Sequence, residues 1–471
     1  MLTSILQVIL LIFIVLMIFN VIIFVHELGH FLAAKWRGLQ VDRFQIWFGR
    51  PIWKKTIGGV QYGLGWIPAG GFVALPQMAP MESIEGSNEQ RAPLPPISAM
   101  DKIIVAFAGP LFSMLLALIA AVAVWKVGKP ADFIPTTVVG FVEPDSPAAA
   151  AGILVGDRIL AINGKPVDGF AGSLDSITEQ IILSRGEKLR VQIQRESMPK
   201  PLEIATGFER EESKWFQRSG LRQIGISASR PAVIGAVVEN SPAEKAGLKP
   251  NDEIVAVDGS PLLSVEQLSY LLKKGDWKAV QLSIKDPQGA VREVLVAPKK
   301  PITPKDSEPR IGIVWDFSRD ADTTIVHPKP FKQVADSLEM MWVTITGVSS
   351  PTSGLGVDHL SGPVGIAKLI YQLLQTEDGW RRILAFMVLF NVNLAVLNML
   401  PFPVLDGGHI TLAILEKIAR RPVQARPLEV IQTACALALI SLMLYITSKD
   451  IGDGFGRGGS GSSNKMIFEP N

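Results

Sequence analysis

The sequence predicts a polytopic α-helical membrane protein with about four transmembrane helices, a small membrane-associated β-region and two α+β modules outside the bilayer. Three observations lead to this fold class. Four apolar stretches are long enough to cross a bilayer as helices, which takes about 20 residues. The mean hydropathy of the 471-residue chain is only +0.29, so a large polar part accompanies these stretches. An internal repeat lies between the second stretch and the third.

The first predicted span covers residues 1–35 and contains no Lys or Arg before Lys35. It lacks the basic start of a signal peptide and is too long for one, so we expect it to remain in the mature protein. It contains His26-Glu27-Leu28-Gly29-His30, an H-E-x-x-H pattern. Residues four apart share one helix face, so His26 and His30 can bind one Zn²⁺ while Glu27 acts as a general base. Ionisable groups at bilayer depth are costly and usually functional, which favours a metal site over two packed histidines.

Residues 36–100 follow this span as a membrane-associated β-region and a loop. Apolar side chains alternate at Phe44, Ile46 and Phe48, and glycine pairs occur at Gly58-Gly59 and Gly70-Gly71. This alternation with turn residues is typical of short strands rather than of a helix. The second span is predicted at residues 101–128.

Residues 129–229 and 230–318 are predicted to form two copies of one module. The first copy contains Ser146-Pro147, Asp157 and Gly164, and the second repeats them 95 residues later as Ser241-Pro242, Asp252 and Gly259. Each copy has an alternating strand that ends in an Asn-Gly or Asp-Gly turn, and each closes with Ile-Gly-Ile. The pattern resembles a circularly permuted PDZ domain. Such domains bind extended peptides or chain ends by strand addition; the alternative is an inert spacer or a size-limiting cap.

The remaining segments complete the predicted order. Residues 319–379 hold a linker and a helix whose apolar face indicates either an interfacial amphipathic helix or a helix packed against the modules. Residues 380–410 are the third span, 411–427 a loop, and 428–451 the fourth span. The tail 452–471 contains Gly-Gly-Ser-Gly-Ser-Ser, which is typical of a flexible linker or a cloning remnant. The apolar face of the helix carries Phe331, Val334, Ala335, Leu338, Met341, Trp342 and Ile345.

A catalytic zinc needs a third protein ligand and an open position for water. Cys435 is the only cysteine, so Cys-rich zinc sites are excluded. Asp406, after the helix-breaking Pro401 and Pro403, lies at the end of the third span that shares a membrane face with the metal motif. His409 is a rival ligand that spacing does not exclude. The two other histidines, His327 and His359, lie in segments predicted on the opposite side of the membrane.

Basic residues predict the orientation in the membrane. They follow the first span at Lys35, Arg37, Arg43, Arg50, Lys54 and Lys55, and they fill the loop before the fourth span at Lys417, Arg420, Arg421 and Arg426. The positive-inside rule therefore makes both loops cytoplasmic, and it places both termini and the two modules on the opposite side, which in a Gram-negative cell is the periplasm. The net charge of +2 gives no support for nucleic-acid binding.

Three features together resemble the site-2 protease family, and within it the sigma-E regulator proteases of Gram-negative bacteria. They are HELGH in the first span, Asn398-x-x-Pro-x-Pro-x-Leu-Asp406-Gly at the end of the third, and the paired PDZ-like repeats. The resemblance implies that His26, His30 and Asp406 are zinc ligands, that Glu27 is the catalytic base, and that His409 is only a neighbour. It implies that Asn393 and Asn398 hold the substrate backbone, although Asn in a membrane helix also commonly links helices.

The resemblance further implies a function in the bacterial inner membrane. The expected reaction is zinc-dependent cleavage of single-span membrane proteins, such as an anti-sigma factor or remnant signal peptides, with the β-region pairing with the unwound substrate and the PDZ pair acting as a size filter. Two alternatives remain. One is a metal transporter, since ionisable residues in membrane helices also mark ion pathways; the other is a membrane-anchored PDZ scaffold with an inactive site.

Overall fold

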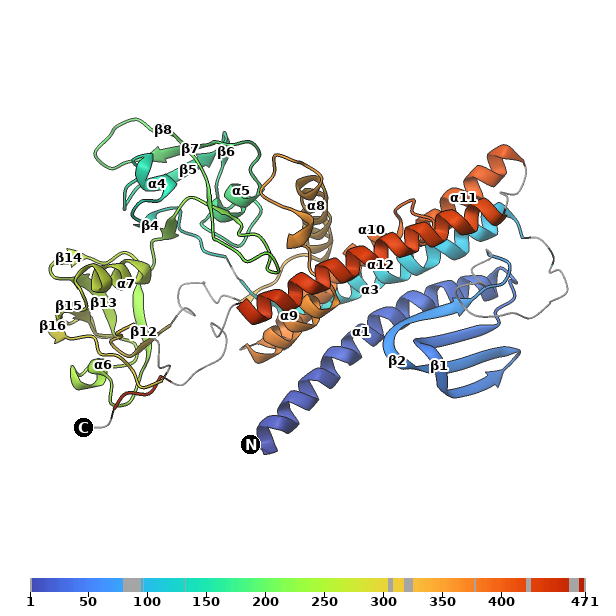
Figure 1. The fold of residues 1–471 in the computed structure, drawn as a ribbon, viewed down its shortest axis with the longest axis horizontal. Helices are drawn as coiled ribbons and strands as arrows, with labels where there is room; N and C mark the ends of the chain where they lie inside the picture. Colours follow the sequence, from blue (N-terminus) through green and yellow to red (C-terminus); the bar gives the residue numbers. More distant parts are fainter. Residues whose placement is uncertain are drawn as a thin grey trace. The chain divides into compact units, whose positions relative to one another are not determined.

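The computed structural model describes residues 2–78, 95, 97–131, 133–303, 308–316, 325–376, 378–420, 425–456 and 466–469 (Figure 1). The chain divides into two compact units. The helical unit comprises Met1–Lys129, Val326–Trp342 and Ser361–Asp450, and the module unit comprises Pro130–Ile325, Val343–Leu360 and Ile451–Asn471. Two short strands, β3 (Lys129–Pro130) and β18 (Ile325–Val326), lie where the chain passes from one unit to the other.

Four helices in the described part are long and apolar enough to cross a membrane. They are α1 (Leu2–Trp36), α3 (Ala99–Val127), α10 (Gly379–Asn398) and α12 (Ala425–Gly456). These helices occupy the four apolar stretches of the sequence. The start of α3 is fixed by a capping box, in which the Ser98 hydroxyl accepts from the Asp101 amide and the Asp101 carboxylate accepts from the Ser98 amide. Asp101 also pairs with Arg37 at the end of α1, at 2.6 Å.

The predicted third segment, 380–410, consists of parts of two helices instead of one. Helix α10 ends at Asn398, and a separate helix, α11 (Asp406–Ala419), begins at Asp406. Pro401 and Pro403 lack the amide hydrogen that a continuous helix needs, so the chain turns between them. Helix α11 also replaces much of the loop predicted at 411–427, of which Arg421 and the side chain of Arg426 lie outside the described residues.

A further helix, α9 (Pro363–Gln375), was not predicted, because the Gly, Ser and Pro before it indicate a loop. Proline suits the first position of a helix, where its missing amide hydrogen would have no partner. The Asp450 carboxylate in α12 accepts from the amides of Gly362 and Gly365, at 3.1 and 2.8 Å. This acceptor from the far end of the sequence caps the helix start. The predicted amphipathic helix is present as α8 (Pro330–Val348), in which Met341 is buried whereas Phe331 and Trp342 are exposed.

The β-region consists of β1 (Arg43–Ile57) and β2 (Val60–Ala74), both strongly bent. The first part of β1 pairs with both halves of β2, so that Phe44 lies opposite Tyr62 on one side and Val73 on the other. The segment Gly71–Ala74 therefore forms one edge of this small sheet. Phe44 packs with Phe31 of α1, which fixes the sheet on the helix that carries the H-E-x-x-H pattern. Residues 79–94 of the predicted loop lie outside the described part.

The first module contains a four-stranded sheet of order β6-β5-β7-β8 and the strand pairs β4-β11 and β9-β10. Its core joins these sheets through Ile159, Ile177 and Ile193, each no more than 1% exposed. Its elements are β4 (Val139–Val142), α4 (Pro147–Ala150), β5 (Arg158–Ile162), β6 (Lys165–Pro166), α5 (Ile177–Leu183), β7 (Leu189–Gln194), β8 (Leu202–Thr206), β9 (Glu209–Arg210), β10 (Arg222–Gln223) and β11 (Ile226–Ala228).

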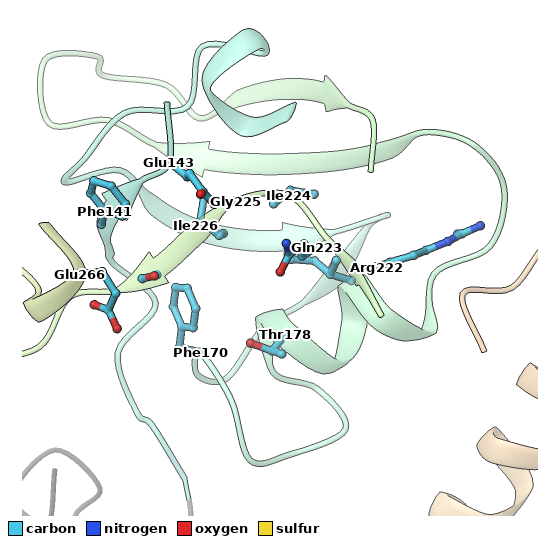
Figure 2. A pocket seen from close by; sticks show the side chains of 12 residues that line it. Phe141, Glu143, Phe170, Thr178, Arg222, Gln223, Ile224, Gly225, Ile226 and Glu266 are labelled. Carbon is cyan, nitrogen blue, oxygen red and sulfur yellow. The ribbon is translucent and has the colours of Figure 1, made fainter. Parts of the chain in front are cut away.

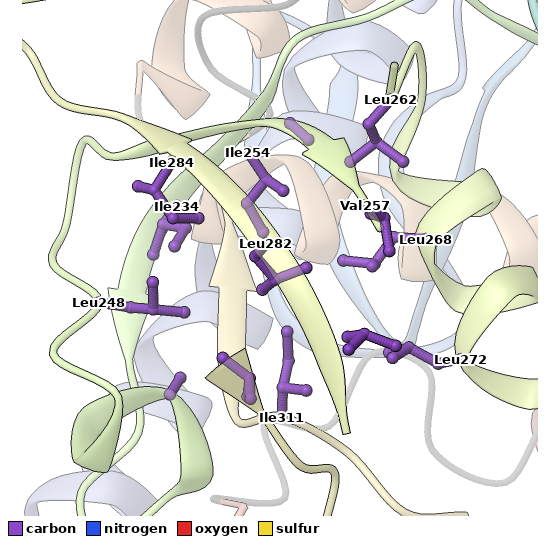
Figure 3. Close-up of a cluster of buried hydrophobic side chains, with 14 of the residues drawn as sticks. Ile234, Leu248, Ile254, Val257, Leu262, Leu268, Leu272, Leu282, Ile284 and Ile311 are labelled. Carbon is purple, nitrogen blue, oxygen red and sulfur yellow. The ribbon is translucent and has the colours of Figure 1, made fainter. Parts of the chain in front are cut away.

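The second module repeats this arrangement with a six-stranded sheet of order β16-β15-β13-β12-β17, to which β14 adds beside β13. Figure 3 shows Ile234, Ile254 and Leu282 gathered in its core. Its elements are β12 (Ala232–Val237), α6 (Pro242–Lys245), β13 (Glu253–Val257), β14 (Ser260–Pro261), α7 (Val265–Lys274), β15 (Val280–Lys285), β16 (Val291–Val296) and β17 (Ile313–Trp315).

The residues that define the sequence repeat are structural in both modules. Ser146 and Ser241 cap the short helices α4 and α6 through their hydroxyls. The repeated aspartates are buried ion-pair partners, since Asp157 binds Arg195 at 2.8 Å and Asp252 binds Arg292 at 2.5 Å. Removing the arginine would leave a buried carboxylate without its partner, which is destabilising.

The tail from residue 452 was predicted to be flexible throughout, but the structure shows ordered segments at both of its ends. Helix α12 continues to Gly456, and Met466–Glu469 pack against the second module. A Gly/Ser-rich composition indicated a linker, but it said nothing about the apolar residues beyond it. Residues 457–465 lie outside the described part.

Candidate metal centre

The helical unit brings together His26 and His30 of α1 and Asp406 of α11. The two imidazole Nε2 atoms are 3.3 Å apart, and the Asp406 carboxylate oxygens lie 3.3 and 3.4 Å from them. The two histidines are 8% and 9% exposed. One donor atom from each residue lies within 4.8 Å of the others, so the three could hold one metal ion.

Helix α3 orients both imidazoles from behind. The Nδ1 atom of His30 is 2.8 Å from the Val105 carbonyl oxygen, and that of His26 is 2.9 Å from the Ser113 hydroxyl. A carbonyl oxygen only accepts, so Nδ1 of His30 carries the proton and its Nε2 lone pair is directed at the metal position. Sequence reasoning identified neither Ser113 nor the role of α3.

Gly109 of α3 leaves the space in which the two Nε2 atoms meet. A Cβ atom at this position would lie 2.2 Å from Nε2 of His30 and 2.9 Å from Nε2 of His26. Both distances are far shorter than a van der Waals contact. A glycine beside Pro110 within an apolar helix was the available signal, because a helix-interior glycine usually has a packing or functional reason.

The turn before α11 presents Asp406. Cβ atoms on Gly407 and Gly408 would meet the carbonyl oxygens of Met399 and Phe402 at 2.2 and 2.1 Å, so only glycine allows this turn to close over the helix start. Asp406 is the first residue of α11, where the helix dipole stabilises a carboxylate.

The other histidines do not join the cluster. His409 is the next titratable residue along α11, and it is not part of the three-residue group. The Nδ1 atom of His327 is 2.9 Å from the Trp125 carbonyl oxygen. Within the module unit, Nε2 of His359 is 3.0 Å from the Ser219 carbonyl oxygen.

Glu27 lies between the metal cluster and the edge of the β-region. Its carboxylate accepts a hydrogen bond from the backbone amide of Val73 and is within electrostatic range of both histidines and Asp406. A Cβ atom on Gly71 would lie 3.4 Å from Cγ of Glu27, so the sheet edge passes directly beside this side chain. The Val73 amide is therefore the polar group of the sheet edge that faces this carboxylate.

Asn393 and Asn398 both lie in the second half of α10. The side-chain oxygen of Asn393 is buried, and among the described residues it has no hydrogen-bond partner. The same is true of Asn391, whose side chain is fully buried and which the sequence did not single out. The hydrogen bonds that orient the imidazoles come from α3, not from these asparagines.

The donor set fits a zinc-type ion. Two imidazoles and one carboxylate are a recurrent ligand set of catalytic zinc, which keeps its fourth position open. Asp406 Oδ2 is a buried oxygen with no hydrogen-bond partner in the described part of the chain. Such an oxygen is costly to bury unless a cation compensates it.

Comparison with known proteins agrees with this geometry. The model of peptidase family M50 matches residues 13–442 of the chain. A protein of Neisseria meningitidis serogroup A, named provisionally as a zinc metalloprotease, is 31% identical over 91% of this chain and 96% of its own length. The regulator of sigma-E protease RseP of Salmonella typhimurium is 28% identical over 90% of this chain and 94% of its own.

The family match covers both halves of the metal cluster, from the H-E-x-x-H pattern on α1 to Asp406 on α11. The resemblance inferred from these two motifs is thereby confirmed. The chain belongs to peptidase family M50, the site-2 protease family, and it is a metalloprotease.

Proposed function

We propose that the protein is a zinc-dependent intramembrane peptidase that cleaves single-span membrane proteins. The observation that carries the proposal is the convergence of His26, His30 and Asp406, with Glu27 beside them, on helices packed in a membrane-length bundle. A peptidase requires a general base near its metal ligands, and Glu27 meets that requirement. A metal transporter would not require it.

In this mechanism the three ligands hold the ion and Glu27 moves the proton. When bound, zinc acidifies a water molecule and polarises the peptide carbonyl group. Glu27 accepts the proton of the attacking water and returns it to the amine nitrogen as the carbon–nitrogen bond breaks. The Val73 amide keeps the carboxylate directed at the cluster, while Ser113 and Val105 keep the imidazoles in place.

The edge Gly71–Ala74 supports a way of presenting the substrate. A helix exposes no peptide bond to attack, so a transmembrane substrate has to unwind before cleavage, and its freed backbone groups then need partners. An extended segment that adds to a sheet edge obtains them. We assign this task to the edge beside Glu27, and we assign Asn393 and Asn398 to the substrate backbone, since the Asn393 amide oxygen is buried and unpaired among the described residues.

The two modules are proposed to be PDZ domains in the periplasm. The positive-inside pattern supports this orientation, with both termini periplasmic and the protein in the bacterial inner membrane. The name of the Salmonella relative ties that protein to sigma-E regulation. An anti-sigma factor already shortened in the periplasm is therefore the first substrate to test here, and remnant signal peptides are the second.

The test is cleavage of a truncated single-span protein by purified full-length enzyme in detergent, with zinc content measured by mass spectrometry. Asp406→Ala should bind zinc more than about 100-fold more weakly and lose cleavage. His409→Ala should retain both, because His409 is outside the cluster. Zinc loss in His409→Ala but not in Asp406→Ala would reverse the ligand assignment. Zinc flux into liposomes without cleavage would favour a transporter, and a wild type that binds no zinc would favour a scaffold.

The first module has a cavity of about 360 Å³ where a PDZ domain holds its peptide (Figure 2). Thr178 and Ile181 of α5 form one side, and the segment Ile224–Ser227, which runs into β11, forms another. Glu266 of α7, in the second module, also lines the cavity. Both signs of charge line this cavity, with Arg222 in one part and glutamates in others. Glu143 lines the cavity, and an oxygen of Glu209 lies 3.1 Å from the Cβ position of Gly225. Burial, followed by the charge of Glu143, raises the pKa of Glu209 above its usual value. Beside Glu143 and Glu209, a free chain-end carboxylate would meet like charge.

We therefore expect this cavity to prefer an extended segment without a terminal carboxylate. A peptide with an amidated end should bind the full-length protein about tenfold more tightly than the same peptide with a free carboxyl group, since like charges at an interface disfavour binding. Glu143→Gln should reduce this preference, whereas Glu187→Gln, a residue outside the cavity, should not change it. Fluorescence anisotropy with both peptides gives the ratio. A preference for the free carboxyl group would contradict this assignment.

A further inference from the structure

The segment Met466–Glu469 pairs with the second module as a short extended strand. Ile467 forms an antiparallel bridge with Thr303. The Ile302 amide donates to the Ile467 carbonyl at 2.7 Å, and the Ile467 amide donates to the Thr303 carbonyl at 3.3 Å. The backbone of the tail is thus recognised without regard to its side chains, as in strand addition.

The neighbouring side chains of Ile467 and Phe468 face opposite ways. Phe468 is 3% exposed, whereas Ile467 is 49% exposed, as expected for neighbours in a strand. The Phe468 ring lies 3.0 Å from the Cβ position of Gly312, in the Ile311-Gly312-Ile313 sequence that closes the module. Burying a phenylalanine side chain contributes about 1.5–3 kcal/mol, so Phe468 is the main anchor.

In the first module, the space beside the glycine of the Ile-Gly-Ile sequence is filled by a residue of the module itself instead of by the tail. There the equivalent glycine is Gly225. Two atoms of Ser146 lie nearest to its Cβ position, and the next nearest atom is a carboxylate oxygen of Glu209, at 3.1 Å. In the second module Ser241 takes the place of Ser146, and Phe468 takes the place of Glu209. Thus the first module's own fold supplies the neighbour of its glycine, whereas in the second module the neighbour, Phe468, comes from 156 positions after Gly312.

We propose that this edge of the second module is a binding site for an extended segment with a buried aromatic residue, and that Met466–Glu469 is its tethered, reversible ligand. Only nine residues, 457–465, connect the end of α12 to the segment. So short a connection gives an effective concentration on the order of millimolar. Any other segment of the same pattern, from a second copy or from a substrate, must displace the tail before it binds.

The test uses a fluorescent, amidated peptide of residues 465–471, Lys-Met-Ile-Phe-Glu-Pro-Asn, added to full-length protein in detergent. Wild type should bind it weakly because its own tail fills the site. Phe468→Ala should bind it at least about tenfold more tightly, since the tail no longer competes. Ile467→Ala is the matched control, because its side chain is exposed, and it should behave as wild type.

Hydrogen exchange provides a second readout that does not depend on the peptide. Exchange at the Ile302 amide should quicken in Phe468→Ala and not in Ile467→Ala, while strands β13 and β15 stay protected in both. Equal peptide binding by Phe468→Ala and wild type, or unchanged exchange at Ile302, would overturn the proposal. Neither measurement involves the metal or cleavage, so this inference stands or falls independently of the proposed peptidase activity.

Discussion

Full-length protein carrying Glu27→Gln is expected to keep its zinc and to cleave a single-span substrate about 10²–10⁴-fold more slowly than wild type, the usual range for loss of a general base. Glutamine has nearly the same shape and still offers an oxygen to the Val73 amide, so the sheet edge and the metal ligands should not move. Only the ability to take a proton is lost. Single-turnover cleavage rates and zinc content, measured on the same preparation, separate these two effects.

Asp336→Asn is a suitable control for this experiment. It also replaces one carboxylate by an amide, but Asp336 is an exposed residue of α8 that pairs with Lys332. Its cleavage rate and zinc content should equal those of wild type. If Glu27→Gln cleaves as fast as wild type, the base is another group, and the mechanism proposed here is wrong.

Gly109→Ala is expected to weaken zinc binding although no proposed ligand is replaced. The added methyl group would lie 2.2 Å from Nε2 of His30, so the imidazole or α3 must shift. Overpacking of this kind typically costs about 1–3 kcal/mol, and here it falls on the donor atom itself. We expect zinc affinity to fall at least about tenfold, with a parallel loss of cleavage.

Leu111→Ala provides the comparison for that variant. Leu111 lies two residues further along α3 and is 40% exposed, so its truncation changes the same helix away from the cluster. Zinc affinity measured by competition with a chelator should remain near the wild-type value in this protein. Full zinc binding by Gly109→Ala would show that the two imidazoles bind metal in a different arrangement from the one described.

The metal cluster was largely predictable because its chemistry is local. Two histidines four residues apart on a helix must share a face, whatever the rest of the fold does. Ser113 and Val105 were not predictable, because they matter only through the way α3 packs on α1. Likewise, Asp406 and His409 are three residues apart, and their spacing alone does not show that Asp406 is the one in the three-residue group.

Outside the metal cluster, too, the sequence predicted the segments that depend on local features and missed those that depend on distant partners. Apolar length located the membrane helices, since a bilayer imposes one dimension on them all. Helix α9 and the strand Met466–Glu469 were missed because long-range partners complete both, namely the Asp450 carboxylate and the backbone of Ile302 and Thr303. Local composition cannot report such partners.

The wide separation of the metal ligands along the chain also matters during synthesis. His30 and Asp406 are 376 positions apart, so the ribosome reaches the third ligand last. At bacterial elongation rates of about 5–20 residues per second, the interval is roughly 20 s or more. During that time the nascent chain carries the H-E-x-x-H helix without Asp406. On the proposed ligand set, the metal site is therefore complete only when translation is nearly finished.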